Sequence, residues 1–83
     1  MSTHLTPEAL RAGRAILKWS MRDLAHESGA GVATINALEN GQRSRAAHAA
    51  TIEKIVATFT RHGVDILPPP HAGARLNGLA ERV

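Results

Sequence analysis

The chain has 83 residues, of which 43% are apolar, and its ten basic and seven acidic residues give a net charge of +3 without any cysteine. This length holds one small core, and the lack of cysteine excludes both a disulfide framework and a thiolate metal site. No apolar run reaches membrane-spanning length and the N-terminus lacks the features of a signal peptide, so we expect a cytoplasmic protein without a membrane partner.

A first helix is predicted from Pro7 to about Lys18. Thr6 can cap it, Pro7 has the φ angle that the first helical position favours, and Glu8 complements the helix dipole. The residues expected on its buried side are Leu10, Ile16 and Leu17.

The second helix is predicted to begin directly after Ser20. Ser20 is expected to be its N-cap and Asp23 to reach back to the Ser20 N–H, which is a capping box with Asp in place of Glu. Trp19 and Leu24 flank this cap as a hydrophobic staple would. A DNA-facing role for Trp19 is the alternative, but we favour packing against the core.

Residues 21–40 have the spacing of two short helices joined by a sharp turn. Ala25 is small enough for close helix packing, and Gly29 can adopt the positive φ that the turn needs. The apolar positions expected between the two helices are Leu24, Ile35 and Leu38. We predict that the second helix of this motif spans residues 32–40, with Gly31 as a weak N-cap and Gly41 as its left-handed C′ residue.

The remainder of the chain predicts one more helix and two short strands. A loop at 42–45 leads to a helix over 46–62 that Gly63 ends, with a buried stripe formed by Ile52, Ile55, Val56 and Phe59. Residues 64–67 and 74–76 are expected to be strands, separated by a loop that the prolines 68–70 begin. We therefore divide the chain into a helical domain, 1–63, and a β extension with a frayed tail, 64–83, whose strand edges would pair with a second subunit.

Residues 21–40, closing with Leu38-Glu39-Asn40-Gly41, resemble the Cro/phage-repressor (XRE-type) class of bacterial helix-turn-helix regulators. The similarity extends from about Leu5 to Leu76. It implies a mainly α fold: a compact four-helix, lambda-repressor-like DNA-binding domain with a helix-turn-helix and a short C-terminal β-hairpin extension. It also implies a sequence-specific transcriptional regulator that binds double-stranded DNA, as a homodimer on an inverted repeat, with the helix 32–40 in the major groove.

The resemblance also assigns roles to individual residues. Arg14 and Glu39 occupy the positions of a structural ion pair, in which an Arg on the first helix meets a Glu ending the recognition helix. The positions expected to face bases are Val32, Ala33, Thr34, Asn36 and Ala37. The positions expected to face phosphates are Met21, Arg22, Asn40, Arg43 and Arg45. Two features depart from the family: Met21 stands where Gln is common, and Asn36 alone is a strong hydrogen-bonding reader, suited to adenine.

These departures keep a second function open, in which the scaffold serves as an antitoxin or a protein-binding adaptor. The apolar face of the helix 32–40 favours a protein partner such as a toxin, whereas Arg residues around that face favour phosphates, and we favour DNA. RNA polymerase is a further candidate partner. Eight of the ten basic residues are Arg, which suits phosphate but equally a solvated surface.

Nothing in the sequence predicts an enzyme, a cofactor or a metal site. Ser20, Asp23 and His26 lie close together, but Ser20 is needed as a helix cap and one short helix does not orient a nucleophile and its base. The five histidines have no zinc-binding spacing.

Overall fold

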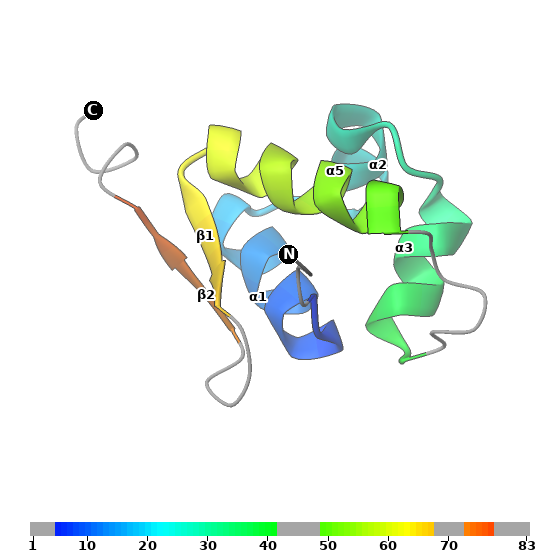
Figure 1. The fold of residues 1–83 in the computed structure, drawn as a ribbon, viewed down its shortest axis with the longest axis horizontal. Helices are drawn as coiled ribbons and strands as arrows, with labels where there is room; N and C mark the ends of the chain where they lie inside the picture. The colour runs from blue at the N-terminus through cyan, green and yellow to red at the C-terminus, as the bar shows by residue number, and fades with distance from the viewer. Residues whose placement is uncertain (1–4, 42–48, 68–72, 78–83) are drawn as a thin grey trace.

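The computed structural model describes residues 5–41, 49–67 and 73–77 of the chain. Within them it contains four helices and an antiparallel hairpin, as the sequence predicts (Figure 1). In chain order the elements are α1 (Pro7–Leu17), α2 (Met21–Ser28), α3 (Val32–Glu39), α5 (Ala49–Arg61), β1 (Val64–Leu67) and β2 (Gly73–Leu76).

The ends of α1 and α2 are fixed by the predicted local signals. The Thr6 hydroxyl accepts a hydrogen bond from the Ala9 N–H at 3.0 Å. Ser20 Oγ accepts from the Asp23 N–H at 3.0 Å while Asp23 Oδ2 accepts from the Ser20 N–H at 2.9 Å, so the capping box is complete. One boundary differs slightly: α1 ends at Leu17, because Lys18 adopts a left-handed conformation with φ of 58° and serves as the C-cap.

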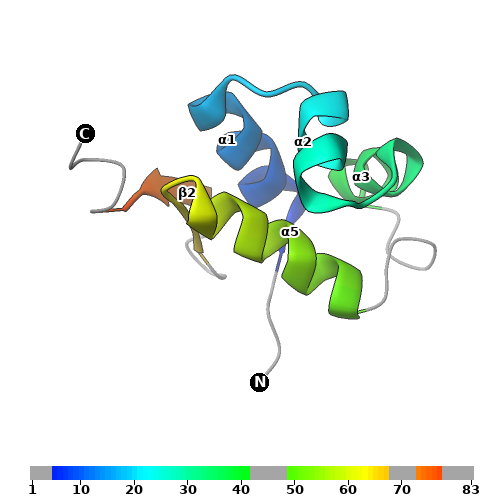
Figure 2. The same ribbon diagram turned by 90° about the horizontal axis from the view of Figure 1, so that it is seen from above.

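The turn between α2 and α3 is made by Gly29, which has a φ of +82° and caps α2 with its N–H on the Ala25 carbonyl. Glycine adopts this conformation without the steric cost of a Cβ. The two helices then lie side by side, and Leu24 and Ile35 are fully buried while Leu38 is nearly so. Figure 2 shows α2 and α3 adjacent, with α5 passing beside α2. The predicted helix-turn-helix is therefore present, although its second helix ends at Glu39, one residue earlier than expected, with Asn40 as the C-cap.

Phe59 is at the centre of an otherwise aliphatic core. It is fully buried on α5, together with Ile55, and the Trp19 ring stacks on it with a centroid distance of 6.3 Å. Trp19 thus packs against the core, as we favoured. Gly13 of α1 is also buried, and a Cβ built on it would lie 2.8 Å from the Phe59 ring. The side of α1 that is completely buried consists of Ala9, Leu10 and Gly13, whereas Ile16 and Leu17 are only partly buried.

The helix that was expected over 46–62 is described from Ala49 to Arg61; residues 46–48 lie outside the described part of the chain. Gly63 follows it with a φ of +88° and turns the chain into the hairpin. The strands pair antiparallel, with Val64 opposite Leu76 and Ile66 opposite Ala74, and β2 begins at Gly73, one residue earlier than expected.

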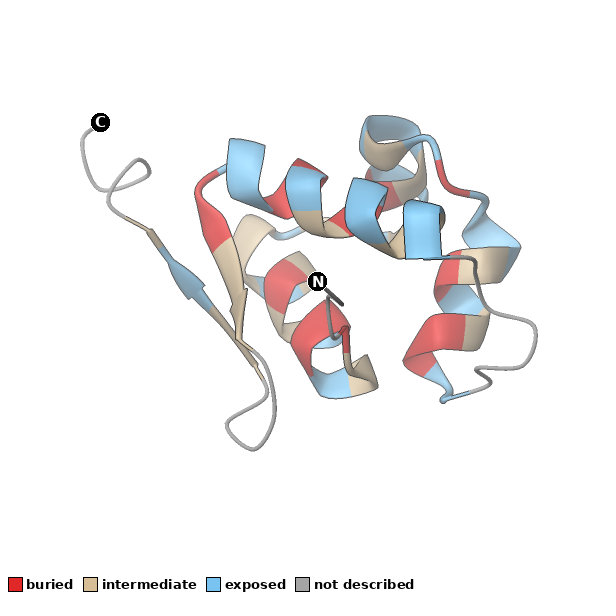
Figure 3. Ribbon diagram, in the orientation of Figure 1, coloured by how far each residue is buried: buried red, intermediate tan, exposed pale blue. Residues whose placement is uncertain are grey.

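The hairpin packs against α1 and α5, and it does not stand apart from the helices. Val64 is fully buried in the core, and Ile66 and Ala74 pack against it. Beyond the last strand, the Asn77 N–H donates to the Gly63 carbonyl at 2.7 Å and its side chain donates to Asp65 at 3.1 Å. The outer strand is the more exposed one (Figure 3).

Candidate nucleic-acid interface

One side of α3 is open to solvent and the opposite side is core. Val32 is 41% exposed, and Ala33, Asn36 and Asn40 are exposed as well, whereas Ile35 and Glu39 are buried. Because residues four apart lie above one another on a helix, Val32, Asn36 and Asn40 form a row with Ala33 beside it. We call these four residues the exposed stripe of α3.

The expected base-facing set coincides with this stripe only in part. Val32, Ala33 and Asn36 are on it, and Ala37 borders it and is partly buried. Thr34 is partly buried and projects from another side of the helix, close to Gly31. Gly31 is the N-cap of α3, as expected, and provides no side-chain hydrogen bond.

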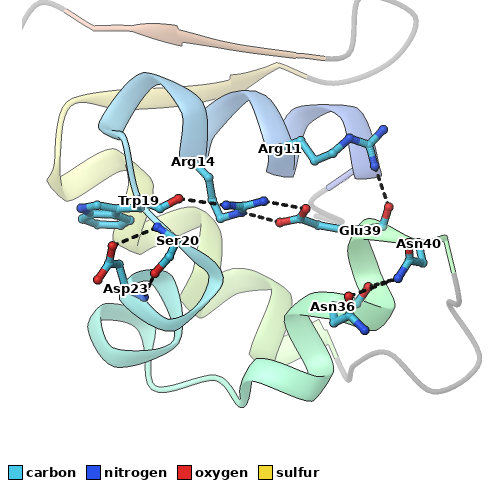
Figure 4. Close-up of polar contacts among 8 residues, drawn as sticks. All are labelled: Arg11, Arg14, Trp19, Ser20, Asp23, Asn36, Glu39 and Asn40. Atoms are coloured by element: carbon cyan, nitrogen blue, oxygen red, sulfur yellow. Dashed lines mark hydrogen bonds and ion pairs between the residues drawn. The ribbon is translucent and has the colours of Figure 1, made fainter.

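Arg14 of α1 and Glu39 at the end of α3 form a bidentate ion pair (Figure 4). Arg14 Nε lies 2.5 Å from Glu39 Oε2, and Nη2 lies 2.9 Å from Oε1. The Glu39 side chain is 4% exposed and that of Arg14 is 20% exposed. The remaining nitrogen, Nη1, donates to the Trp19 carbonyl at 2.9 Å. A single guanidinium thereby connects α1, the turn before α2 and the last residue of α3.

Hydrogen bonding to Glu39 raises the pKa of the Arg14 guanidinium above its ordinary value, and burial partly offsets this rise. A basic group whose pKa is raised by folding stabilises the protein fully below its unfolded-state pKa. This contribution is lost only when the pH rises through the raised pKa of Arg14, far above the neutral range. The Arg14 guanidinium is therefore charged throughout the neutral range.

Arg11 makes a second connection to α3 that the sequence analysis missed. Its Nη1 donates to the Glu39 carbonyl at 2.7 Å, while Nη2 lies 4.0 Å from the Glu8 carboxylate. The carbonyls of a last helical turn have no partner within the helix, so this bond satisfies one of them. The available signal was the spacing of Arg11 and Arg14, which places both on one side of α1.

The residues expected to face phosphates differ in how exposed their side chains are and in what those side chains contact. Arg22 is exposed near the start of α2, where the positive end of the helix dipole lies. Met21 is partly buried and packs against the core, so only its backbone N–H is suited to a phosphate. Asn40 is exposed, and its side chain is bonded to Asn36. Arg43 and Arg45 lie outside the described residues.

Other kinds of site are not evident in the described segments. They contain no group of three or more His, Asp or Glu side chains that could hold a metal ion. His62 Nε2 lies 3.5 Å from Glu27 Oε1, and the His62 and Trp19 rings are in a T-shaped contact. None of the described helices combines the length and the apolar character needed to cross a membrane.

A family model described as helix-turn-helix matches residues 10–62, from the middle of α1 to the end of α5. No curated protein matches the chain. The matched region contains the two helices, the glycine turn and the ion pair that hold the exposed stripe of α3, and it covers more than half of the sequence. The chain therefore belongs to the Cro/repressor-like, XRE-type family of DNA-binding helix-turn-helix regulators.

Proposed function

We propose that the protein is a sequence-specific transcriptional regulator that inserts α3 into the major groove of double-stranded DNA. The observation that carries this proposal is that α3 exposes one stripe to solvent while its opposite side is held by the rest of the domain. Arg14 and Arg11 bind the end of α3 from α1, and Ile35 anchors its middle in the core. A rigidly held helix with a free side is what groove recognition requires.

The composition of the stripe indicates how the bases would be read. Asn36 is suited to the N6 and N7 groups of adenine, while Val32 and Ala33 can contact thymine methyl groups. The affinity would come largely from phosphate contacts, for which Arg22, Arg43 and Arg45 are the candidates. Readout of an A·T-containing site with strong salt dependence is therefore expected.

We further propose that the protein acts as a homodimer on an inverted repeat. One short recognition helix provides few base contacts, and a two-fold arrangement doubles them, with half-sites about 34 Å apart. The candidate dimer contact is β2, which pairs with β1 along one edge and has no strand on its other edge among the described residues. Its exposed residues Arg75 and Leu76 and its free edge suit pairing with the same strand of a second copy.

A protein-binding role is the second candidate, in which the domain is an antitoxin or an adaptor. The observation that favours it is Val32, a large apolar side chain that is 41% exposed on the stripe. One exposed valine is common on protein surfaces, so this observation is weaker than the family match.

Selection of bound sequences from random double-stranded DNA tests the proposal. We expect enrichment of an inverted repeat with A·T pairs in each half-site. Arg61→Ala is the matched control, because Arg61 is exposed at the end of α5 farthest from α3 (Figure 1) and should leave the enriched sequence unchanged. Absence of any enriched sequence, with tight binding to a protein partner, would favour the adaptor role instead.

A further inference from the structure

Asn36 and Asn40 are joined through their side chains on the exposed stripe of α3. Asn40 Nδ2 donates to the Asn36 backbone carbonyl at 3.0 Å and to Asn36 Oδ1 at 3.2 Å (Figure 4). The backbone N–H of Asn40 also donates to the Asn36 carbonyl, at 3.1 Å. We call this arrangement the Asn36–Asn40 amide pair.

The pair determines which polar groups remain available on each side chain. A primary amide has two N–H donors and one carbonyl oxygen with two lone pairs. The donors of Asn40 have two acceptors on Asn36, so Asn40 presents only its Oδ1 to a ligand. Asn36 keeps both of its Nδ2 donors and one lone pair on Oδ1.

With only its Oδ1 acceptor available, the Asn40 side chain does not suit a phosphate contact. Phosphate oxygens are acceptors, and an amide oxygen has nothing to donate to them. A base edge is a better match, because adenine presents the N7 acceptor beside the N6 amino donor in the major groove. Asn36 has the complementary donor and acceptor on neighbouring atoms.

We infer that Asn40 is a positioning residue for Asn36, and that the Asn36–Asn40 amide pair reads an adenine in the major groove. The inference rests on the proposed DNA-binding function. Holding Oδ1 towards Asn40 prevents the Asn36 amide from rotating to donate both N–H groups to guanine, which presents two acceptors, N7 and O6. Because the side chain is already oriented, less conformational entropy is lost on binding.

The test uses the full chain and four proteins: wild type, Asn36→Ala, Asn40→Ala and the double variant. Each is measured on the sequence enriched from random DNA, and on the same DNA with the key adenine replaced by guanine or by 7-deazaadenine, which lacks N7. For the wild type we expect either replacement to weaken binding about 5- to 150-fold.

The ratio of adenine to guanine affinity identifies the positioning role. Asn40→Ala should lower this ratio at the same base pair as Asn36→Ala, and the double variant should be no less selective than Asn36→Ala alone. Asn40→Asp is a second variant of nearly the same size that lacks the Nδ2 donors. Its added charge weakens binding to all sequences alike, so the ratio still reports the loss of the pair.

Two outcomes would overturn the inference in distinguishable ways. If Asn40→Ala weakens binding equally on every sequence and leaves the ratio of adenine to guanine affinity unchanged, Asn40 contacts the DNA backbone and does not position Asn36. The proposed function would then stand. If the wild type binds no DNA sequence at all, the proposed function fails and the inference fails with it.

Discussion

Arg14 is the residue whose contacts matter most for the position of α3. It donates to both carboxylate oxygens of Glu39 and to the Trp19 carbonyl, and only a fifth of its side chain is exposed. A buried ion pair often adds little net stability compared with apolar side chains, but removal of one partner leaves the other charge uncompensated. Its role is therefore best measured by removing each partner separately.

We predict that Arg14→Ala destabilises the domain by more than the roughly 0.5 kcal/mol typical of surface changes. The upper bound is the ~3–5 kcal/mol of breaking a fully buried pair. Urea unfolding measures the effect, and Arg61→Ala is the control at an exposed arginine. In a double-mutant cycle with Glu39→Ala we expect a coupling of about 0.5–3 kcal/mol. Additive effects of the two substitutions would contradict the pairing.

Gly13 shows how closely α1 approaches the core. Although alanine favours a helix over glycine by about 1 kcal/mol, a Cβ at this position would lie 2.8 Å from the buried Phe59 ring. Overpacking of this kind costs about 1–3 kcal/mol, so we predict that Gly13→Ala lowers the free energy of unfolding. The same substitution in a Phe59→Leu background should cost less, because the ring is absent. Stabilisation by Gly13→Ala in the wild-type background would show that Phe59 moves easily.

At the scale of elements, the hairpin is both part of the core and the candidate dimer contact. Val64 is fully buried, so deleting the hairpin would destabilise the helices and would not isolate its role in assembly. A substitution on β2, the outer strand, can test the role of the hairpin in assembly without removing its contribution to the core. Leu76 is 49% exposed and lies opposite Val64 at the end of β2.

We predict that Leu76→Asp yields a folded monomer, because a charge at an exposed strand edge opposes pairing with a second copy. Sedimentation velocity measures the oligomeric state, and circular dichroism checks the fold. Binding to the inverted repeat should weaken, while binding to a single half-site should be unchanged. Glu53→Ala, at an exposed position of α5 outside the proposed dimer contact, is the control. A Leu76→Asp protein that still sediments as a dimer would place the interface on the helices.

At the scale of the whole molecule, the modest net charge of +3 makes the placement of the cations more important than their number. Arg22 is exposed at the start of α2, next to the helix that carries the exposed stripe. Arg43 and Arg45 follow that helix directly in the sequence. Arg61 is the last residue of α5, and this end of the helix lies away from α3 (Figure 1).

We predict that Arg22→Ala lowers the log–log salt slope of DNA binding by about 0.9, and that Arg43→Ala with Arg45→Ala lowers it by up to about two. Because phosphate contacts do not depend on base sequence, the loss should be equal on specific and non-specific DNA. Arg61→Ala should leave the slope unchanged. An unchanged slope in the first two variants would remove these arginines from the interface. Fluorescence anisotropy over a range of salt concentrations makes the measurement.

The sequence by itself determined the elements and their ends, because those depend on interactions between residues close together in the chain. The Ser20–Asp23 capping box, the positive φ of Gly29 and the turn at Gly63 that follows α5 are of this kind. The apolar spacing likewise predicted that Leu24, Ile35 and Phe59 are buried. The ends of α1, α3 and α5 and the start of β2 differed from the prediction by about one residue. At the end of α1 the reason is that Lys18, a non-glycine residue in the left-handed conformation, has no reliable local signal.

Only the tertiary structure decided how distant residues meet. The bond from Arg11 to the Glu39 carbonyl, the contact of Gly13 with Phe59 and the packing of the hairpin on α1 join segments far apart in the sequence. The direction of each side chain around α3 also came from the structure, which separated Thr34 from the exposed stripe and bonded Asn40 to Asn36. The physical reason is that periodicity gives the side of a helix that is buried, whereas hydrogen-bond partners depend on the packing of one element against another.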